Sequence, residues 1–184
     1  MKQLVLALSI TTLLIAQRVP LSAQTSNKDT SGPICPMHLE HGKQDPHAAA
    51  VEANGDRAMG FAHDKTTHHF LMANDGGAIE VTANDPSDNL DIESIRTHLA
   101  QVASMFGNGD YSTPMLVHGA IPPGVTTMKL VKDRISFKFE PINAGGRVRI
   151  ESSDPIALAA IHDFLRFQIT DHQTGDPLVV EPTR

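Results

Sequence analysis

The chain has 184 residues, with 15 Lys and Arg against 21 Asp and Glu, ten His, one Cys and a formal net charge of −6. At roughly 100–200 residues per domain, this length predicts one globular domain. The acidic balance, without any run of Lys or Arg, excludes a strongly basic surface and so argues against a nucleic-acid partner. A single Cys excludes an intramolecular disulfide framework.

Residues 1–23 are typical of a secretory signal peptide. Lys2 supplies the positive start, and residues 4–16 form an apolar stretch. That stretch is shorter than the roughly 20 apolar residues of a membrane-spanning helix. We therefore predict cleavage after Ala23, a periplasmic or extracellular protein, and no membrane contact once the signal is removed. An uncleaved membrane anchor is the alternative.

Residues 24–54 are polar and lack apolar periodicity, which predicts a flexible N-terminal arm. The arm contains Cys35, Met37 and His38 in the tetrapeptide Cys-Pro-Met-His. Thiolate, thioether and imidazole together suit copper(I), whereas Cys and His alone suit zinc. The tetrapeptide resembles the short motif of heavy-metal-binding modules attached to bacterial metal-efflux proteins. A cysteine without function, or one that forms an intermolecular disulfide, is the alternative.

An internal repeat organises the rest of the chain. Residues 68–86 and 137–155 match at a constant offset of 69, and each is typical of a strand, a Gly-Gly turn, a second strand and an Asp-Pro helix start. Apolar residues at helical spacing predict one helix over residues 91–106 and another over 155–170, with an offset of 66 between their apolar stripes.

Two strand–strand–helix units predict an α+β domain over residues 55–175, followed by a C-terminal tail, 176–184. We expect a four-stranded antiparallel sheet with both helices on one face.

Strand alternation separates the histidines of the first predicted strand. His68 shares the parity of Phe70 and is expected on the helix-covered face, whereas His69 points to the open face. His63 has the parity of His69, so these two could share a site on the open face. A core histidine with a hydrogen-bonded ring is the alternative for His68.

Histidines elsewhere in the chain are weighed in the same way. His118 follows an apolar run and precedes a glycine in a predicted loop, where functional residues are common. His98 and His162 lie near the apolar stripes of the predicted helices, and amphipathic packing explains both. The candidate metal ligands are therefore His63, His68, His69, His118, Cys35, Met37 and His38.

Residues 59–70 have the sequence Met-Gly-Phe-Ala-His-Asp-Lys-Thr-Thr-His-His-Phe. This stretch resembles the opening signature of a family of small secreted bacterial proteins. The resemblance continues to about residues 171–172. The family has no established activity, so the resemblance implies no site residues. Automated naming sometimes labels members aspartate carbamoyltransferase. This chain lacks the Ser-Thr-Arg-Thr phosphate-binding motif of that enzyme, and one small duplicated domain cannot supply its two α/β domains.

Three hypotheses follow. The first is a secreted protein that binds a metal ion, copper or zinc, through the histidines, with the Cys35 segment as a delivery arm. The second is a non-catalytic binding module or homodimer, favoured by Phe164 and Phe167, which lie off the predicted apolar stripe. The third is a small hydrolase or transferase that uses the histidines. The sequence contains no Gly-x-Ser-x-Gly, Walker A or His-Glu-x-x-His motif.

Overall fold

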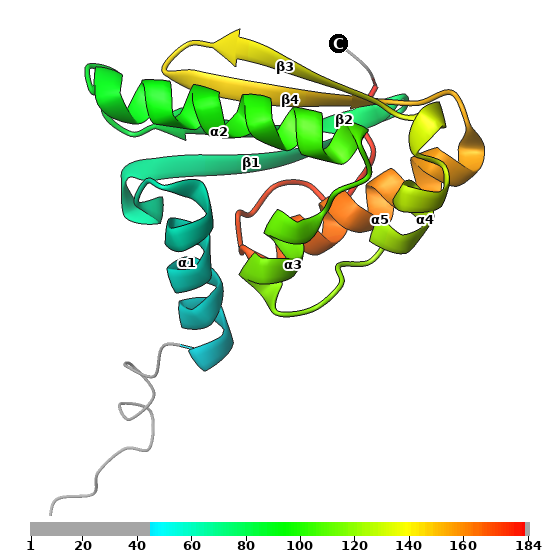
Figure 1. The fold of residues 1–184 in the computed structure, drawn as a ribbon, viewed down its shortest axis with the longest axis horizontal. Coiled ribbons are helices and arrows are strands. Elements are labelled where there is room, and N and C mark those ends of the chain that lie inside the picture. Colours follow the sequence, from blue (N-terminus) through cyan, green and yellow to red (C-terminus); the bar gives the residue numbers. More distant parts are fainter. Residues whose placement is uncertain (1–44, 183–184) are drawn as a thin grey trace, which may run out of the picture. The chain divides into compact units, whose positions relative to one another are not determined.

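The computed structural model describes residues 45–182 (Figure 1). The predicted signal peptide, most of the predicted arm, and Cys35, Met37 and His38 lie outside the described residues. The helices and strands are α1 (Pro46–Met59), β1 (Thr66–Ala73), β2 (Gly76–Ala83), α2 (Asn89–Gly107), α3 (Ser112–His118), α4 (Val125–Leu130), β3 (Ser136–Ile142), β4 (Gly145–Glu151) and α5 (Pro155–Asp171), with short 3-10 turns at His63–Lys65 and Lys132–Arg134.

The strands form one antiparallel sheet in the order β1-β2-β4-β3. The two hairpins are β1-β2 and β3-β4, and they meet where β2 pairs with β4. The predicted α+β architecture, a four-stranded antiparallel sheet built from two repeated units, is confirmed.

Both glycine pairs lie in strands rather than in the turns where the sequence suggested them. The turns are made by residues 74–75 and 143–144, and Gly145 begins β4. A Cβ on Gly145 would lie 2.0 Å from the carbonyl oxygen of Val81, and one on Gly76 would lie 2.1 Å from that of Ile150. The glycines therefore allow the close approach of β2 and β4 that joins the two halves.

Helices α2 and α5 cover the same face of the sheet. Helix α5 packs on β1 and β2, and α2 packs on β3 and β4. The start of α5 follows the predicted cap, because the Asp154 carboxylate accepts hydrogen bonds from the backbone N–H groups of Ile156 and Ala157, and Pro155 is the first helical residue. The apolar stripes of both helices join the inner side chains of the strands in one core.

Helix α1 corrects the predicted arm, which was drawn as far as residue 54. Within that range the structure instead describes α1, and the carboxylate of Asp45 accepts a hydrogen bond from the N–H of His47 and caps this helix. Val51 and Gly55 are buried, and α1 packs against α3. The few large apolar residues of this helix gave no periodic signal, so its burial depends on tertiary contacts.

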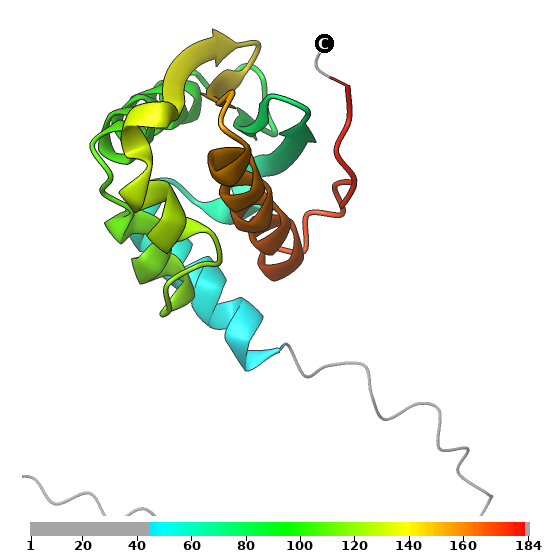
Figure 2. The same ribbon diagram turned by 90° about the vertical axis from the view of Figure 1, so that its right-hand side faces the viewer.

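The chain after α5 lies along the outer edge of β1, and Figure 2 shows this segment in red running beside α5 toward the sheet. Glu181 forms an isolated parallel bridge with Ala73, its N–H donates to the carbonyl of Met72 at 3.0 Å, and its carbonyl accepts from the N–H of Asn74 at 3.1 Å. The predicted tail therefore covers part of an otherwise open strand edge. Between residues 45 and 182, no helix has the length and apolar character needed to cross a membrane.

Candidate functional site

A partly open cavity of about 80 Å³ lies between the helix-covered face of the sheet and the surrounding helices. Four histidines line it, one from β1, one from α2, one at the end of α3 and one just after α5: His68, His98, His118 and His172. Most of the other lining residues are apolar, among them Met59, Phe70, Ile79, Val81, Leu99, Val102, Phe106 and Phe164. The cavity is thus an apolar space into which imidazole rings from four separate elements converge.

His68 lies on the helix-covered face, as strand alternation predicts. Its Nε2 atom is 3.4 Å from the Sδ atom of Met59, at the end of α1. Burial, with smaller contributions from neighbouring histidines, lowers the pKa of His68 to about 4. At neutral pH this ring is therefore uncharged, and one of its nitrogens carries a free lone pair.

His172 follows the last residue of α5 and places its ring against two side chains of β1. The ring is parallel to that of His68, with centroids 6.3 Å apart, and stacks on Phe70 at 5.4 Å. Within residues 45–182, neither ring nitrogen of His172 forms a hydrogen bond. Burial, with smaller contributions from the neighbouring His118 and His68, lowers the pKa of His172 to about 3.

His118 is the most buried of the four, with a side chain only 1% exposed. Its Nδ1 atom lies 2.5 Å from Oδ2 of Asp171, and its Nε2 atom lies 3.0 Å from Oε1 of Gln168. Both ring nitrogens of His118 therefore have a side-chain oxygen within hydrogen-bond distance. The other oxygen of Asp171 lies 2.8 Å from Nε2 of His47, which ties the start of α1 to the end of α5.

The carboxylate of Asp171 is therefore within hydrogen-bond distance of two histidines, His47 and His118. Its burial raises its pKa, but the hydrogen bonds from His47 and His118 outweigh burial and lower the pKa overall. The Nε2 atom of Gln168 is buried and has no hydrogen-bond partner among the described residues, although Gln168 lines the cavity. An unsatisfied donor at the cavity wall is costly and is a position where a bound acceptor would stabilise the protein.

His98 completes the lining from α2. Its ring meets Phe61 edge-on at 5.7 Å, and burial lowers its pKa. Packing against an aromatic ring accounts for its position, as its place near the apolar stripe suggests.

The cavity side chains do not form a ready-made metal site of the commonest kind. In the part of the chain that the structure describes, no three His, Cys, Asp or Glu side chains are grouped closely enough to hold a metal ion. Nε2 of His68 and Sδ of Met59 are instead in contact, 3.4 Å apart. Two ligand atoms bonded to one ion at about 2.0 Å and 2.3 Å, with about 104° between the bonds, are about 3.4 Å apart. This pair therefore already has the spacing of two adjacent ligands.

Other predicted ligands lie elsewhere. The Nδ1 atom of His63 is 2.9 Å from Asp56 of α1, and this hydrogen bond raises the pKa of His63. The Nδ1 atom of His69 is 2.8 Å from Asp176, on the C-terminal segment. Of the predicted ligands, the structure brings together His68 and His118 alone, and Cys35, Met37 and His38 lie outside the described residues.

Sequence reasoning missed Met59 and His172 as lining residues and assigned His98 to packing. The offset of 66 between the helical stripes offered a signal, because it aligns His172 with Phe106 and His98 with Phe164. Both aromatic partners are core residues, so their histidine equivalents are expected in the interior as well. Phe164 itself was predicted as an exposed aromatic, and that prediction is wrong, because only 1% of it is exposed.

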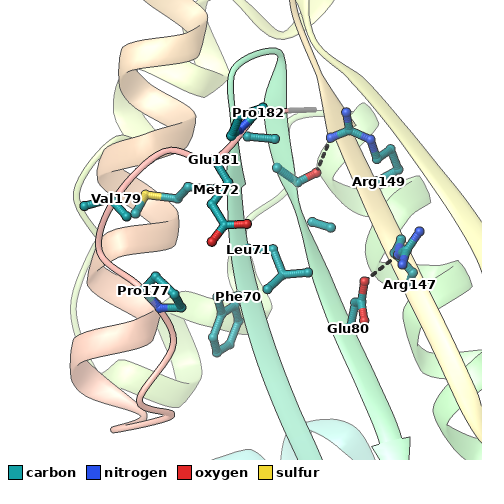
Figure 3. A pocket seen from close by; sticks show the side chains of 13 residues that line it. Phe70, Leu71, Met72, Glu80, Arg147, Arg149, Pro177, Val179, Glu181 and Pro182 are labelled. Atoms are coloured by element: carbon teal, nitrogen blue, oxygen red, sulfur yellow. Dashed lines mark hydrogen bonds and ion pairs between the residues drawn. The ribbon is translucent and has the colours of Figure 1, made fainter. Parts of the chain in front are cut away.

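A second hollow, of about 390 Å³, lies on the open face of the sheet beside the C-terminal segment (Figure 3). Leu71 and Val179 give it an apolar floor and wall, and Arg147 and Arg149 line its far side. Both arginines have acidic partners, because Arg147 lies 2.6 Å from Glu80 and Arg149 lies 2.6 Å from Asp75. This open-face groove is wide, but its charges are already paired.

Comparisons of the chain with family models, with curated proteins and with solved structures find no match. The candidate function therefore has to be argued from the chemistry of the two hollows.

Proposed function

We propose that the protein binds copper(I) in the histidine-lined cavity, with Met59, His68 and His172 as the ligands. One observation carries the proposal: two uncharged imidazoles and a thioether face the same buried space. With pKa values of about 4 and about 3, His68 and His172 are neutral at physiological pH. Neutral imidazole is the form that coordinates metal ions.

The donor set favours copper(I) over zinc. Zinc sites in proteins are almost always tetrahedral, with Cys, His or carboxylate ligands. The described part of the chain groups no three such side chains. A thioether is a soft ligand that suits copper(I), and a copper(I) ion is satisfied by few ligands. Ligation by Nε2 of His68 requires its proton on Nδ1, and His172 has to rotate within the cavity to complete the set.

Copper(I) titration of the chain from Gln24 to Arg184, against a chromophoric copper(I) chelator, tests the proposal. We expect one copper per chain by elemental analysis, and an affinity that falls at least about tenfold in a Met59→Leu variant, which keeps the volume but removes the sulfur. Met128→Leu is the matched control, because Met128 is fully buried away from the cavity.

A Cys35→Ser variant separates the predicted arm from the cavity. Full copper binding in Cys35→Ser and weakened binding in Met59→Leu would support the cavity. Binding that is lost in Cys35→Ser and unchanged in Met59→Leu would place the metal on the arm and contradict the proposal. The periplasmic or extracellular location predicted from residues 1–23 belongs to the same proposal.

The open-face groove carries a second candidate function, the binding module. Leu71, Val179 and Val180 expose apolar surface in and around it. A small amphipathic ligand, or a second copy of the chain, would cover this surface. A strict monomer at micromolar concentration by light scattering would remove the homodimer. The hydrolase or transferase hypothesis has less support, because both ring nitrogens of His118 already have hydrogen-bond partners.

A further inference from the structure

The ring of His172 lies between the end of α5 and the segment that follows it. The backbone N–H of His172 still donates to the carbonyl of Gln168 at 3.0 Å, so the helix fixes its backbone but not the direction of its ring. The chain then turns sharply, with Gln173 in the left-handed region at φ 53° and Gly175 at φ 77°. A non-glycine residue in this region is strained, and such strain persists only where surrounding contacts hold it. We call residues 172–176 the latch.

Asp176 supplies those contacts at the far end of the latch. One oxygen of its carboxylate accepts hydrogen bonds from the backbone N–H of Phe70 at 2.9 Å and from the hydroxyl of Thr174 at 2.7 Å. The other oxygen lies 2.8 Å from Nδ1 of His69. The side chain of Asp176 is only 7% exposed, so these hydrogen bonds form largely away from water.

The two ends of the latch contact the same residue of β1, Phe70. Asp176 binds the N–H of Phe70 on the outer edge of β1, and the ring of His172 stacks on the side chain of the same Phe70 on the helix-covered face. The inner neighbour of Phe70 is His68, the other proposed imidazole ligand. The latch is thus a short loop at the outer edge of β1 that places the imidazole of His172 in the cavity lining.

We propose that Asp176 is a positioning residue that holds His172 in the cavity, so that the latch controls access to the site. The inference rests on the proposed function for its consequence, copper binding, but the latch itself can be tested without metal. It also gives a role to His69, which the sequence suggested as a ligand and which instead helps to hold the latch from the open face.

The experiment uses the chain from Gln24 to Arg184, with Asp176→Ala and the more conservative Asp176→Asn as test variants. Asp163→Ala is the matched control, because Asp163 is an exposed acid on α5 that pairs with Arg166. Two quantities are measured for each protein: copper(I) affinity, and the rate at which diethyl pyrocarbonate modifies His172 in the metal-free protein. Mass spectrometry of the peptide that contains His172 gives the rate, and circular dichroism verifies folding.

We expect Asp176→Ala to raise the His172 modification rate several-fold and to lower copper affinity about tenfold or more, as loss of a group that orients a ligand typically does. If Asp176→Ala does not fold, Asp176→Asn gives the same readings with smaller changes. An unchanged modification rate in the folded variants would overturn the latch, whatever happens to copper affinity. A faster rate in a protein that binds no copper at all would sustain the latch and reject the proposed function.

Discussion

The two strand–helix interfaces of the domain, β1 on α5 and β3 on α2, use equivalent positions of the repeat for different purposes. With an offset of 69 for the strands and 66 for the helices, His68 is equivalent to Phe137, and His172 to Phe106. The structure pairs them correspondingly, because β1 packs on α5 and β3 packs on α2. His68 and His172 stack at 6.3 Å, whereas the rings of Phe106 and Phe137 meet edge-on at 5.7 Å.

The remaining cavity residues follow the same exchange. His98 is equivalent to Phe164, and Gln168 to Val102. The β3–α2 interface contributes a close-packed aromatic cluster, whereas the equivalent positions around the β1–α5 interface carry imidazoles and an amide that line the cavity of about 80 Å³. Val102, Phe106 and Phe164 also line this cavity. The scaffold can therefore fill a strand–helix interface with apolar side chains, as it does between β3 and α2. The polar version gives up packing, which makes a functional reason for the histidines the simplest explanation.

The largest effect is expected when the β1–α5 interface is given the residues of the β3–α2 interface. The double variant His68→Phe and His172→Phe should lose copper binding altogether, because both proposed imidazole ligands are removed. It should still fold, since the equivalent pair shows that two phenylalanines fit this geometry and the cavity leaves room for them. Copper titration and circular dichroism measure the two outcomes.

His63→Phe is the control for this exchange, because His63 pairs with Asp56 and does not line the cavity. It should bind copper like the unchanged chain. The double variant could instead still bind one copper ion per chain. This result would show that His68 and His172 are not the copper ligands.

A smaller effect, on stability, is expected when the aromatic cluster is opened. Phe106 is 2% exposed and contacts the rings of Tyr111, Phe137 and Phe164. Truncation by Phe106→Ala should lower the free energy of unfolding by about 3–5 kcal/mol, through lost burial and the cavity left behind. The equivalent truncation, His172→Ala, should cost much less in the metal-free protein. Urea unfolding of both variants measures the two losses of unfolding free energy. Equal losses would mean that the β3–α2 and β1–α5 interfaces are packed alike.

The fold and the candidate site differ in how far the sequence could predict them. The fold follows from local signals that both halves share: strand alternation, the helical stripes and the Asp154-Pro155 helix start. The inward direction of His68 follows from the same alternation. These features depend on neighbours a few residues apart, which a sequence displays directly.

The rest of the site depends on contacts between distant parts of the chain. Met59 reaches the cavity because α1 docks on α3, although α1 has little apolar periodicity. His172 reaches it because Asp176 hydrogen-bonds to Phe70, more than a hundred residues earlier in the chain. Neither contact has a local pattern. The candidate site therefore remained partly hidden, and exposed-face histidines such as His69 were the more visible choice.

The pH dependence of stability should differ between the unchanged metal-free chain and the double phenylalanine variant. His68 and His172 have pKa values of about 4 and about 3 in the folded protein. An unfolded histidine titrates near 6.5, so the unfolded chain binds more protons below that pH, and stability falls as the pH falls through this window. Between pH 7 and pH 4.5 each ring should contribute a loss of about 2 kcal/mol. Thermal unfolding across this pH range measures the effect. We expect stability to depend clearly less on pH in the double variant than in the unchanged chain. Parallel profiles would show that the two rings are not buried in the neutral form.

The smallest effect is expected where the helices of the two halves end. Helix α2 is followed by Gly109 at φ 78°, and α5 by Gln173 at φ 53°, each two residues after the last helical residue. In both, the next N–H bonds back to the helix, from Asp110 to Met105 and from Thr174 to Ile169. Glycine adopts this conformation without the Cβ clash that costs other residues roughly 1–2 kcal/mol.

Gln173→Gly should therefore raise the free energy of unfolding by up to about 1 kcal/mol, since the greater freedom of glycine in the unfolded chain offsets part of the relief. The reverse change, Gly109→Gln, should lower it by about 1–2 kcal/mol. Urea unfolding of the two variants at pH 7 measures both changes. Gln173→Gly could make the protein more stable and at the same time weaken copper binding. This result would show that the restricted backbone of Gln173 helps to hold the latch, at an expense of stability that Gly109 after α2 does not incur. A variant that is less stable would mean that Gln173 is held by side-chain contacts rather than strained, and the latch would then depend on Asp176 and Thr174 alone.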